Sequence, residues 1–246
     1  MTTATPRTWS VTARNLPEHA DNPIHTDDGA RAAGFPAAIV AGTTVHAYLT
    51  RPIVEAWGMA WLANGSSTVA FLAPVLADDP VDCVPVVTAD GSVEVRAMVG
   101  GELRARLVAR PEADAVDDWS RRDGEPLPAH VESLVDGRVD YARRAGDDLA
   151  LYATAGIVHP CLWSSLANGV MIRHLVEGPW IHTSSRIVHH ATALVGATAL
   201  VEAKVMDRFE TRRGIRAVVD VNVSVDGGSV ATVRHEALVS LTPTAL

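Results

Sequence analysis

The chain has 246 residues, 48% of them hydrophobic and 20% charged, which predicts an ordinary soluble globular protein of one large or two smaller domains. Its net charge of −8 comes without a basic stripe, so a nucleic acid is not expected as a partner. Two cysteines without a CxxC motif, no apolar leader and no run approaching roughly 18 apolar residues argue against a disulfide scaffold, a thiolate metal site and a membrane protein. We therefore expect a cytoplasmic protein.

Residues 1–110 are predicted to form the first of two similar domains. A helix begins near Thr43, with Thr43 or Thr44 able to cap it, and Pro52 should kink or break it. Period-two patterning and the glycine turns at Asp90-Gly91 and Gly100-Gly101 then indicate hairpin-linked strands near residues 67–76, 81–89, 92–99 and 102–110.

Residues 111–130 break this pattern with Pro, Asp, Glu and Arg, so they read as a linker to a second domain over residues 131–246. There a helix from Pro160 to about Leu175 is apolar nearly all round, which predicts that it is buried. Strands are expected near residues 184–194, 197–209, 214–225 and 229–241.

The two domains repeat one pattern. Residues 39–42 (IVAG) reappear as residues 157–160 (IVHP), an offset of 118 residues, and Ser66-Ser67 reappears as Ser184-Ser185 at the same offset. Consecutive hairpins predict an antiparallel sheet, and one apolar helix per sheet predicts a sheet wrapped around that helix. We expect an α+β protein in which two such units pair edge to edge and form one long sheet.

The segment Asn22-Pro23-Ile24-His25 adds a motif to this architecture. It is followed by a spaced series that covers most of residues 10–110: Asp27, Ala32, Gly34-Phe35, Ile39, Gly42, Phe71, Pro74, Val75 and Asp78. The series resembles the MaoC-like dehydratase family, which includes the R-specific enoyl-CoA hydratases, in its tandem or double-hotdog form. The second half matches more weakly.

The resemblance implies addition of water to a 2-enoyl thioester, or its removal from a 3-hydroxyacyl thioester, on CoA or a carrier protein and without a metal or other cofactor. In the family an Asp and a His five residues later hold one water. A backbone N–H at the start of the central helix polarises the thioester carbonyl. A helix N-terminus suits this task because it favours the negative charge that develops on the oxygen.

Carried over by position, His25 takes the place of the family's His and Asn22 that of its Asn, while Gly42 supplies the helix-start N–H. Thr50 falls where the family often has a small hydroxyl. Tyr48, early in the same helix, is a further candidate to face the ligand.

The place of the family's Asp, five residues before His25, is occupied by Ala20. Asp21 is a candidate for a displaced base, although Asp also favours turns and helix caps. If the pocket keeps hydratase geometry, Ala20→Asp should raise hydration.

The second half shows the opposite loss. Asp147 fills the place of the family's Asp, but Tyr152 stands five residues on, where the family has His. The following loop is also short, since Pro160 lies 8 residues after Tyr152 whereas Gly42 lies 17 residues after His25. Asp147 and Tyr152 are therefore candidates for a second ligand site, and the alternative for Asp147 is a cap near the start of a loop. His159 sits just before the second helix, as a His often does in the family, and is a candidate pocket residue.

The adjacent pair His189-His190 does not predict a metal site, because neighbouring strand residues point to opposite faces. The leading hypothesis is a hydratase or dehydratase of acyl thioesters that works as a homodimer or as a heteromer with a related subunit. Two alternatives stay open. One is a thioesterase, isomerase or cyclase in the same pocket; the other is a non-catalytic acyl-binding or partner subunit.

Overall fold

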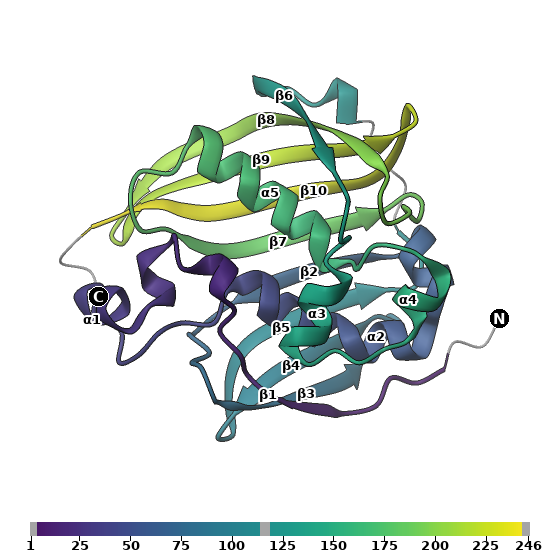
Figure 1. Ribbon diagram of the computed structural model, residues 1–246, viewed down its shortest axis with the longest axis horizontal. Coiled ribbons are helices and arrows are strands. Elements are labelled where there is room, and N and C mark those ends of the chain that lie inside the picture. Colours follow the sequence, from purple (N-terminus) through teal and green to yellow (C-terminus); the bar gives the residue numbers. More distant parts are fainter. Residues whose placement is uncertain (1–3, 114–118, 243–246) are drawn as a thin grey trace.

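In the computed structural model, which describes residues 4–113 and 119–242, one antiparallel sheet wraps around two long helices (Figure 1). These helices are α2 (Gly42–Asn64) and α5 (Cys161–His174). Within the described residues the sheet has ten strands, in the order β1-β3-β4-β5-β2-β7-β10-β9-β8-β6. No helix in those ranges is long and apolar enough to cross a membrane.

The strands of the first half are β1 (Trp9–Thr12), β2 (Ser66–Phe71), β3 (Pro80–Val87), β4 (Val93–Val99) and β5 (Glu102–Arg110). Those of the second half are β6 (Glu125–Ser133), β7 (Ile181–His189), β8 (Thr198–Thr211), β9 (Gly214–Val225) and β10 (Gly228–Leu241). Short helices are η1 (Pro17–His19), η2 (Pro23–His25), α1 (Asp27–Ala32), η3 (Trp119–Arg121), α3 (Val139–Ala145) and α4 (Leu151–Ala155).

The two halves join where β2 pairs with β7, from Ser66 opposite Val188 to Ala70 opposite Ser184. The expected edge-to-edge pairing into one long sheet is therefore confirmed. The repeat extends to the isolated bridges, because Ile39 pairs with Leu76 and Ile157 with Leu194, each residue 118 positions after its counterpart.

Alternating side chains place the core between sheet and helices. On β9 the side chains of Val219, Val221 and Val223 are fully buried, as the period-two pattern predicts. Asp220 is buried too, on the other face, because Arg122 and Arg234 donate to its carboxylate at 2.7 and 2.8 Å.

Helix α2 differs from prediction in two respects. Thr43 and Thr44 lie inside its first turn rather than capping it, and their hydroxyls contact the Tyr141 hydroxyl instead. The helix also continues through Pro52 and breaks at Gly58, whose φ of 55° is one that glycine adopts at little cost.

Two edge strands, β1 and β6, were not predicted from the sequence. β6 begins at Glu125, inside the segment predicted as linker, and pairs with β8, while β1 pairs with β3. Pro126 and Pro128 make a strand unexpected here, because proline is disfavoured in strands. It is tolerated on an edge strand, where only one side of the strand needs hydrogen-bond donors. Residues 114–118 of the predicted linker lie outside the described residues.

Candidate functional site

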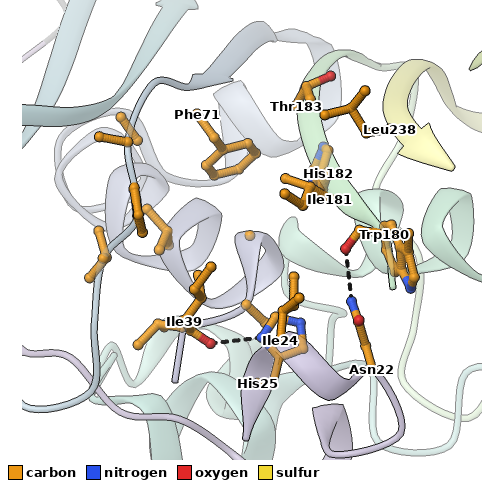
Figure 2. A pocket seen from close by; sticks show the side chains of 18 of the residues that line it. Asn22, Ile24, His25, Ile39, Phe71, Trp180, Ile181, His182, Thr183 and Leu238 are labelled. Atoms are coloured by element: carbon orange, nitrogen blue, oxygen red, sulfur yellow. Dashed lines mark hydrogen bonds between the residues drawn. The ribbon is translucent and has the colours of Figure 1, made fainter. Parts of the chain in front are cut away.

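A cavity of about 690 Å³ lies where the two halves meet (Figure 2). The first half contributes the loop before α2, the first turn of that helix and the end of β2, and the second half contributes the start of β7 with parts of β9 and β10. Its lining includes His19, Asn22, Ile24, His25, Ile39, Gly42, Phe71, Val75, Asn168, Trp180, His182, Thr183, Arg213, Arg216, Glu236 and Leu238.

Two hydrogen bonds, one to the N–H and one to the carbonyl of Ile39, hold the loop that carries His25. Pro23 opens the short helix η2, Ile24 is buried, and the Ile39 N–H donates to the Ile24 carbonyl at 3.0 Å. The Ile39 carbonyl lies 2.7 Å from Nδ1 of His25 (Figure 2), and because a carbonyl only accepts, Nδ1 must carry the proton. Nε2 therefore holds a lone pair.

The environment keeps this imidazole neutral. Burial lowers the pKa of His25 below its ordinary value of 6.5, against the smaller opposing effect of the bond to Ile39. A neutral histidine that lines a cavity with its Nε2 lone pair is a competent general base near neutral pH.

The N-terminus of α2 also reaches the cavity, through Ala41 and Gly42. Ala41 has no side chain that can cap the helix, so the first N–H groups are left for water or a ligand. A Cβ at position 42 would lie 2.9 Å from Nδ1 of His182 and 3.3 Å from its Cβ, so any larger residue there would have to displace the His182 side chain.

Asp21 and Ala20 are placed differently from the family pattern. Both are exposed and neither lines the cavity, so the structure does not bring Asp21 to His25. A carboxylate at position 20 would likewise lie outside the cavity, which removes the basis for expecting Ala20→Asp to restore a base. His19, the last residue of η1, lines the cavity instead.

His19 occupies the space beside His25, with ring centroids 5.5 Å apart. Its Nε2 lies 2.8 Å from the hydroxyl of Tyr141, a residue of α3 in the second half. Burial, followed by the neighbouring His25 and Arg138, lowers the pKa of His19 to about 4. A second neutral imidazole thus stands beside the first.

Asn22 joins the two halves at the cavity wall, since its Nδ2 donates to the Trp180 carbonyl at 2.9 Å (Figure 2). Its Oδ1 is buried without a hydrogen-bond partner among the described residues, as is Oδ1 of Asn168. Two residues of the cavity lining therefore carry a buried acceptor without a partner. The carboxylate in the lining, Glu236, is held by Arg216 and by the Thr183 hydroxyl, both at 2.8 Å.

Tyr48 and Thr50 do not line the cavity. The Tyr48 hydroxyl accepts the Arg14 N–H at 3.0 Å and its ring lies 6.1 Å from that of Trp9, while the Thr50 hydroxyl donates to the Ala47 carbonyl. Both side chains are fully buried. The structure assigns them to the core.

Asp147, Tyr152 and His159 come together, but away from the cavity. Nε2 of His159 lies 3.1 Å from the Asp147 carboxylate, whose other oxygen is 3.3 Å from Nε of Arg51. The rings of Tyr152 and His159 are 4.5 Å apart, and all three candidates are at most 4% exposed. Their cluster is closed, with Arg51 of α2 filling it from the first half.

His182 lines the cavity although the sequence does not predict it as a site residue. This side chain is 6% exposed and lines the cavity, yet residue 182 falls just before the strand predicted at 184–194, whereas β7 begins at Ile181. His189 and His190, which the sequence singles out, have different neighbours: His189 packs on Trp61 and His190 bonds to Thr232. The repeat of Ser66-Ser67 at Ser184-Ser185 predicts this strand, but the predicted strand begins three residues later than β7 does.

Comparison of the sequence with protein families and with curated proteins gives no match. Solved structures with similar folds include three that match nearly the whole chain. A putative MaoC-domain dehydratase from Chloroflexus aurantiacus is 11% identical, with a TM-score of 0.64 and coverage of 97% of this chain and 95% of that one. A conserved hypothetical protein from Mycobacterium tuberculosis, described as a double hotdog, is 14% identical, with a TM-score of 0.62 and 96% of each chain covered. A putative oleoyl thioesterase from Lactobacillus plantarum is 9% identical, with a TM-score of 0.58 and coverage of 97% and 98%.

These likenesses establish the fold. The chain is an α+β double hotdog, as the sequence resemblance implied. At such identities they do not select between the dehydratase and thioesterase chemistries named for those proteins.

Proposed function

We propose that this protein binds an acyl thioester in the cavity between its halves and adds water to a 2-enoyl group or removes it from a 3-hydroxyacyl group. The observation that carries the proposal is the meeting of two features in one cavity: a neutral His25 with an available Nε2, and the uncapped N-terminus of α2 at Gly42.

In the hydration direction the thioester oxygen lies at the Gly42 N–H. His25 Nε2 removes a proton from water as the water oxygen bonds to the β-carbon, and the electron pair of the double bond moves toward the carbonyl. The helix N-terminus stabilises the enolate oxygen that results. His25 then returns its proton to the α-carbon, so that one water is added and the base is regenerated. Dehydration is the reverse.

The cavity wall suits such a substrate. Apolar side chains from both halves offer contacts for an acyl chain, among them Ile24, Ile39, Phe71, Val75 and Leu238. The unpaired Oδ1 atoms of Asn22 and Asn168 suit the amide N–H groups of a pantetheine arm, which CoA and carrier-protein thioesters share.

A second candidate, thioester hydrolysis, is favoured by one observation: His19 rather than a carboxylate lies beside His25. The same base and the same helix terminus would then direct water to the carbonyl carbon instead of the β-carbon. A hydroxide adduct on that carbon would expel the thiolate and leave a free carboxylic acid.

The test is turnover of crotonyl-CoA and longer 2-enoyl-CoA substrates, followed simultaneously by ultraviolet loss of the conjugated enoyl thioester and by a thiol reagent, with product masses determined. Loss of conjugation with gain of one water and no free thiol supports hydration. Release of free thiol supports hydrolysis and overturns the first proposal. Saturable binding without either product supports a non-catalytic acyl-binding subunit.

A further inference from the structure

His182 presents a buried nitrogen with no partner to the α2 N-terminus. Its Nδ1 has no hydrogen bond within the described residues although the side chain is 94% buried. The same atom lies 2.9 Å from the place where a Cβ of Gly42 would stand, and both residues line the cavity (Figure 2 shows His182 on the β7 wall). A buried polar atom without a hydrogen-bond partner lowers stability unless a ligand bonds to it. A ligand group bound at the start of α2 would supply the missing partner.

The opposite edge of the ring is firmly held. Nε2 of His182 lies 2.7 Å from the Ser185 hydroxyl, which lies 2.8 Å from Nδ1 of His235. The two imidazoles stack with centroids 4.2 Å apart, and Phe71 packs on His182 at 4.6 Å. The ring therefore has little freedom to turn away from α2.

The serine hydroxyl couples the two tautomers, because it has a single proton to donate. When Ser185 donates to His182, His235 donates to Ser185 and His182 carries its own proton on Nδ1. In that setting an N–H points from the second half toward the α2 terminus. A negative oxygen at Gly42 favours it over the alternative, in which Nδ1 would present a lone pair.

The ring stays neutral because burial, and then the nearby His235 and His46, lower the pKa of His182 well below its ordinary value. A neutral imidazole is a suitable electrophile beside a helix N-terminus, where an imidazolium would be repelled; triosephosphate isomerase uses a neutral histidine for this purpose.

We propose that His182 donates its Nδ1–H to the thioester oxygen beside the Gly42 N–H, and that Ser185 and His235 are positioning residues that set its tautomer. The inference rests on the proposed thioester function. It is independent of whether water attacks the β-carbon or the carbonyl carbon, because both routes build negative charge on the same oxygen.

The experiment measures polarisation of a bound carbonyl directly. The probe is 4-(dimethylamino)cinnamoyl-CoA, whose absorbance moves to longer wavelength when its thioester carbonyl is polarised. The variants are His182→Leu, which removes the donor, His182→Asn, whose amide N–H can take the place of Nδ1–H, and Ser185→Ala. His190→Leu is the matched control, since His190 lies outside the cavity and bonds to Thr232.

The wild-type protein and His190→Leu should give the full red shift, and His182→Leu should lose most of it and lower turnover by about 10²–10³-fold, as for loss of one oxyanion donor. His182→Asn should recover part of the shift, and Ser185→Ala should reduce the shift with little change in probe affinity. Should His182→Leu not fold, the Asn and Ser185→Ala spectra decide the matter, because both changes are small.

A full red shift in His182→Leu, or unchanged spectra in both other variants, overturns the inference while the proposed function stands. A wild-type protein that binds no acyl thioester overturns both. A His25→Asn protein that loses turnover but keeps the red shift supports the inference, since proton transfer and carbonyl polarisation are then separate tasks.

Discussion

Replacing His25 with asparagine separates the proposed base from the loop that carries it. The asparagine amide can donate to the Ile39 carbonyl, as Nδ1 does at 2.7 Å, but it offers no basic nitrogen in place of Nε2. The loop keeps two further anchors that do not use the imidazole: the Ile39 N–H bond to the Ile24 carbonyl, and the Asn15 side-chain bond to the His25 carbonyl at 2.6 Å. We therefore expect His25→Asn to fold normally and to lose turnover.

The expected loss is that of a general acid–base group, roughly 10²–10⁴-fold in kcat. This equals about 2.7–5.4 kcal/mol of activation free energy at 1.36 kcal/mol for each factor of ten. KM should change little, because the imidazole acts in the transition state rather than in binding. His25→Ala, the parallel variant, should lose the same activity and in addition about 1 kcal/mol of stability, because it removes the hydrogen bond to Ile39.

The assay is initial-rate hydration of a 2-enoyl-CoA between pH 5 and 9, with urea denaturation of each variant as the measure of folding. Because burial lowers the pKa of His25 and the neutral ring is the base, kcat/KM should rise with pH to a half-maximum below 6.5 and then stay level through neutrality. Wild-type turnover in a folded His25→Asn protein, or an acid limb that persists unchanged in it, would refute the assignment of His25.

Four further predictions test the placement of individual residues. Ala20→Asp should change unfolding free energy by no more than roughly 0.5 kcal/mol and leave hydration near the wild-type rate, since the position is exposed and outside the cavity; a marked gain in rate would contradict this. Gly42→Ala should cost about 1–3 kcal/mol in urea denaturation and lower turnover, because its methyl group would meet the His182 ring at 2.9 Å; unchanged values would show that the ring yields freely. Arg51→Met should cost more than Asp147→Asn, up to the roughly 3–5 kcal/mol of a broken buried ion pair, because Arg51 keeps two other carboxylate partners whereas the side-chain partner that Asp147 keeps is the His159 imidazole; equal costs would contradict this. His46, His189 and His235 have native pKa values of about 3, because burial disfavours their charged form, so the unfolded chain binds protons first as the pH falls. The free energy of unfolding should therefore fall between pH 6.5 and 4, by up to roughly 1.4 kcal/mol per pH unit for each of these histidines. A flat profile would contradict these pKa values.

The fold was largely predictable because its signals are local and repeated. Hairpin glycines and the alternating valines of β9 define strands within a few residues, and the 118-residue offset gives the edge-to-edge pairing of the halves. The missed strands, β1 and β6, are edge strands with few buried side chains, so their pairing depends on tertiary context that no period reveals. The break at Gly58 rather than Pro52 has the same origin, since packing of α2 holds the helix together through its proline.

Cavity residues were predictable only where they lie close together in the sequence. Asn22, His25 and Gly42 line the cavity because they belong to a loop and helix start close together in sequence. The sequence could not show that His19, rather than Ala20 or Asp21, lines the cavity, because the short helix η1 that ends at His19 was not predicted. His182 comes from the other half, more than a hundred residues away, and its role depends on the pairing of β7 with β2.

A single pair of equivalent positions explains why the N-termini of α2 and α5 differ. Ala41 precedes α2 and has no side chain to offer, whereas its counterpart 118 residues on is His159, whose Nδ1 accepts the Cys161 N–H at the start of α5. That bond puts the His159 proton on Nε2, toward Asp147, so the second half satisfies its own helix terminus internally. The second half also lacks the long loop that carries His25 in the first, and Arg51 fills the space behind Asp147. The repeat therefore supplies two equivalent helix N-termini. His159 caps the N-terminus of α5, whereas that of α2 is left for a ligand. The second half contributes His182 to the cavity instead.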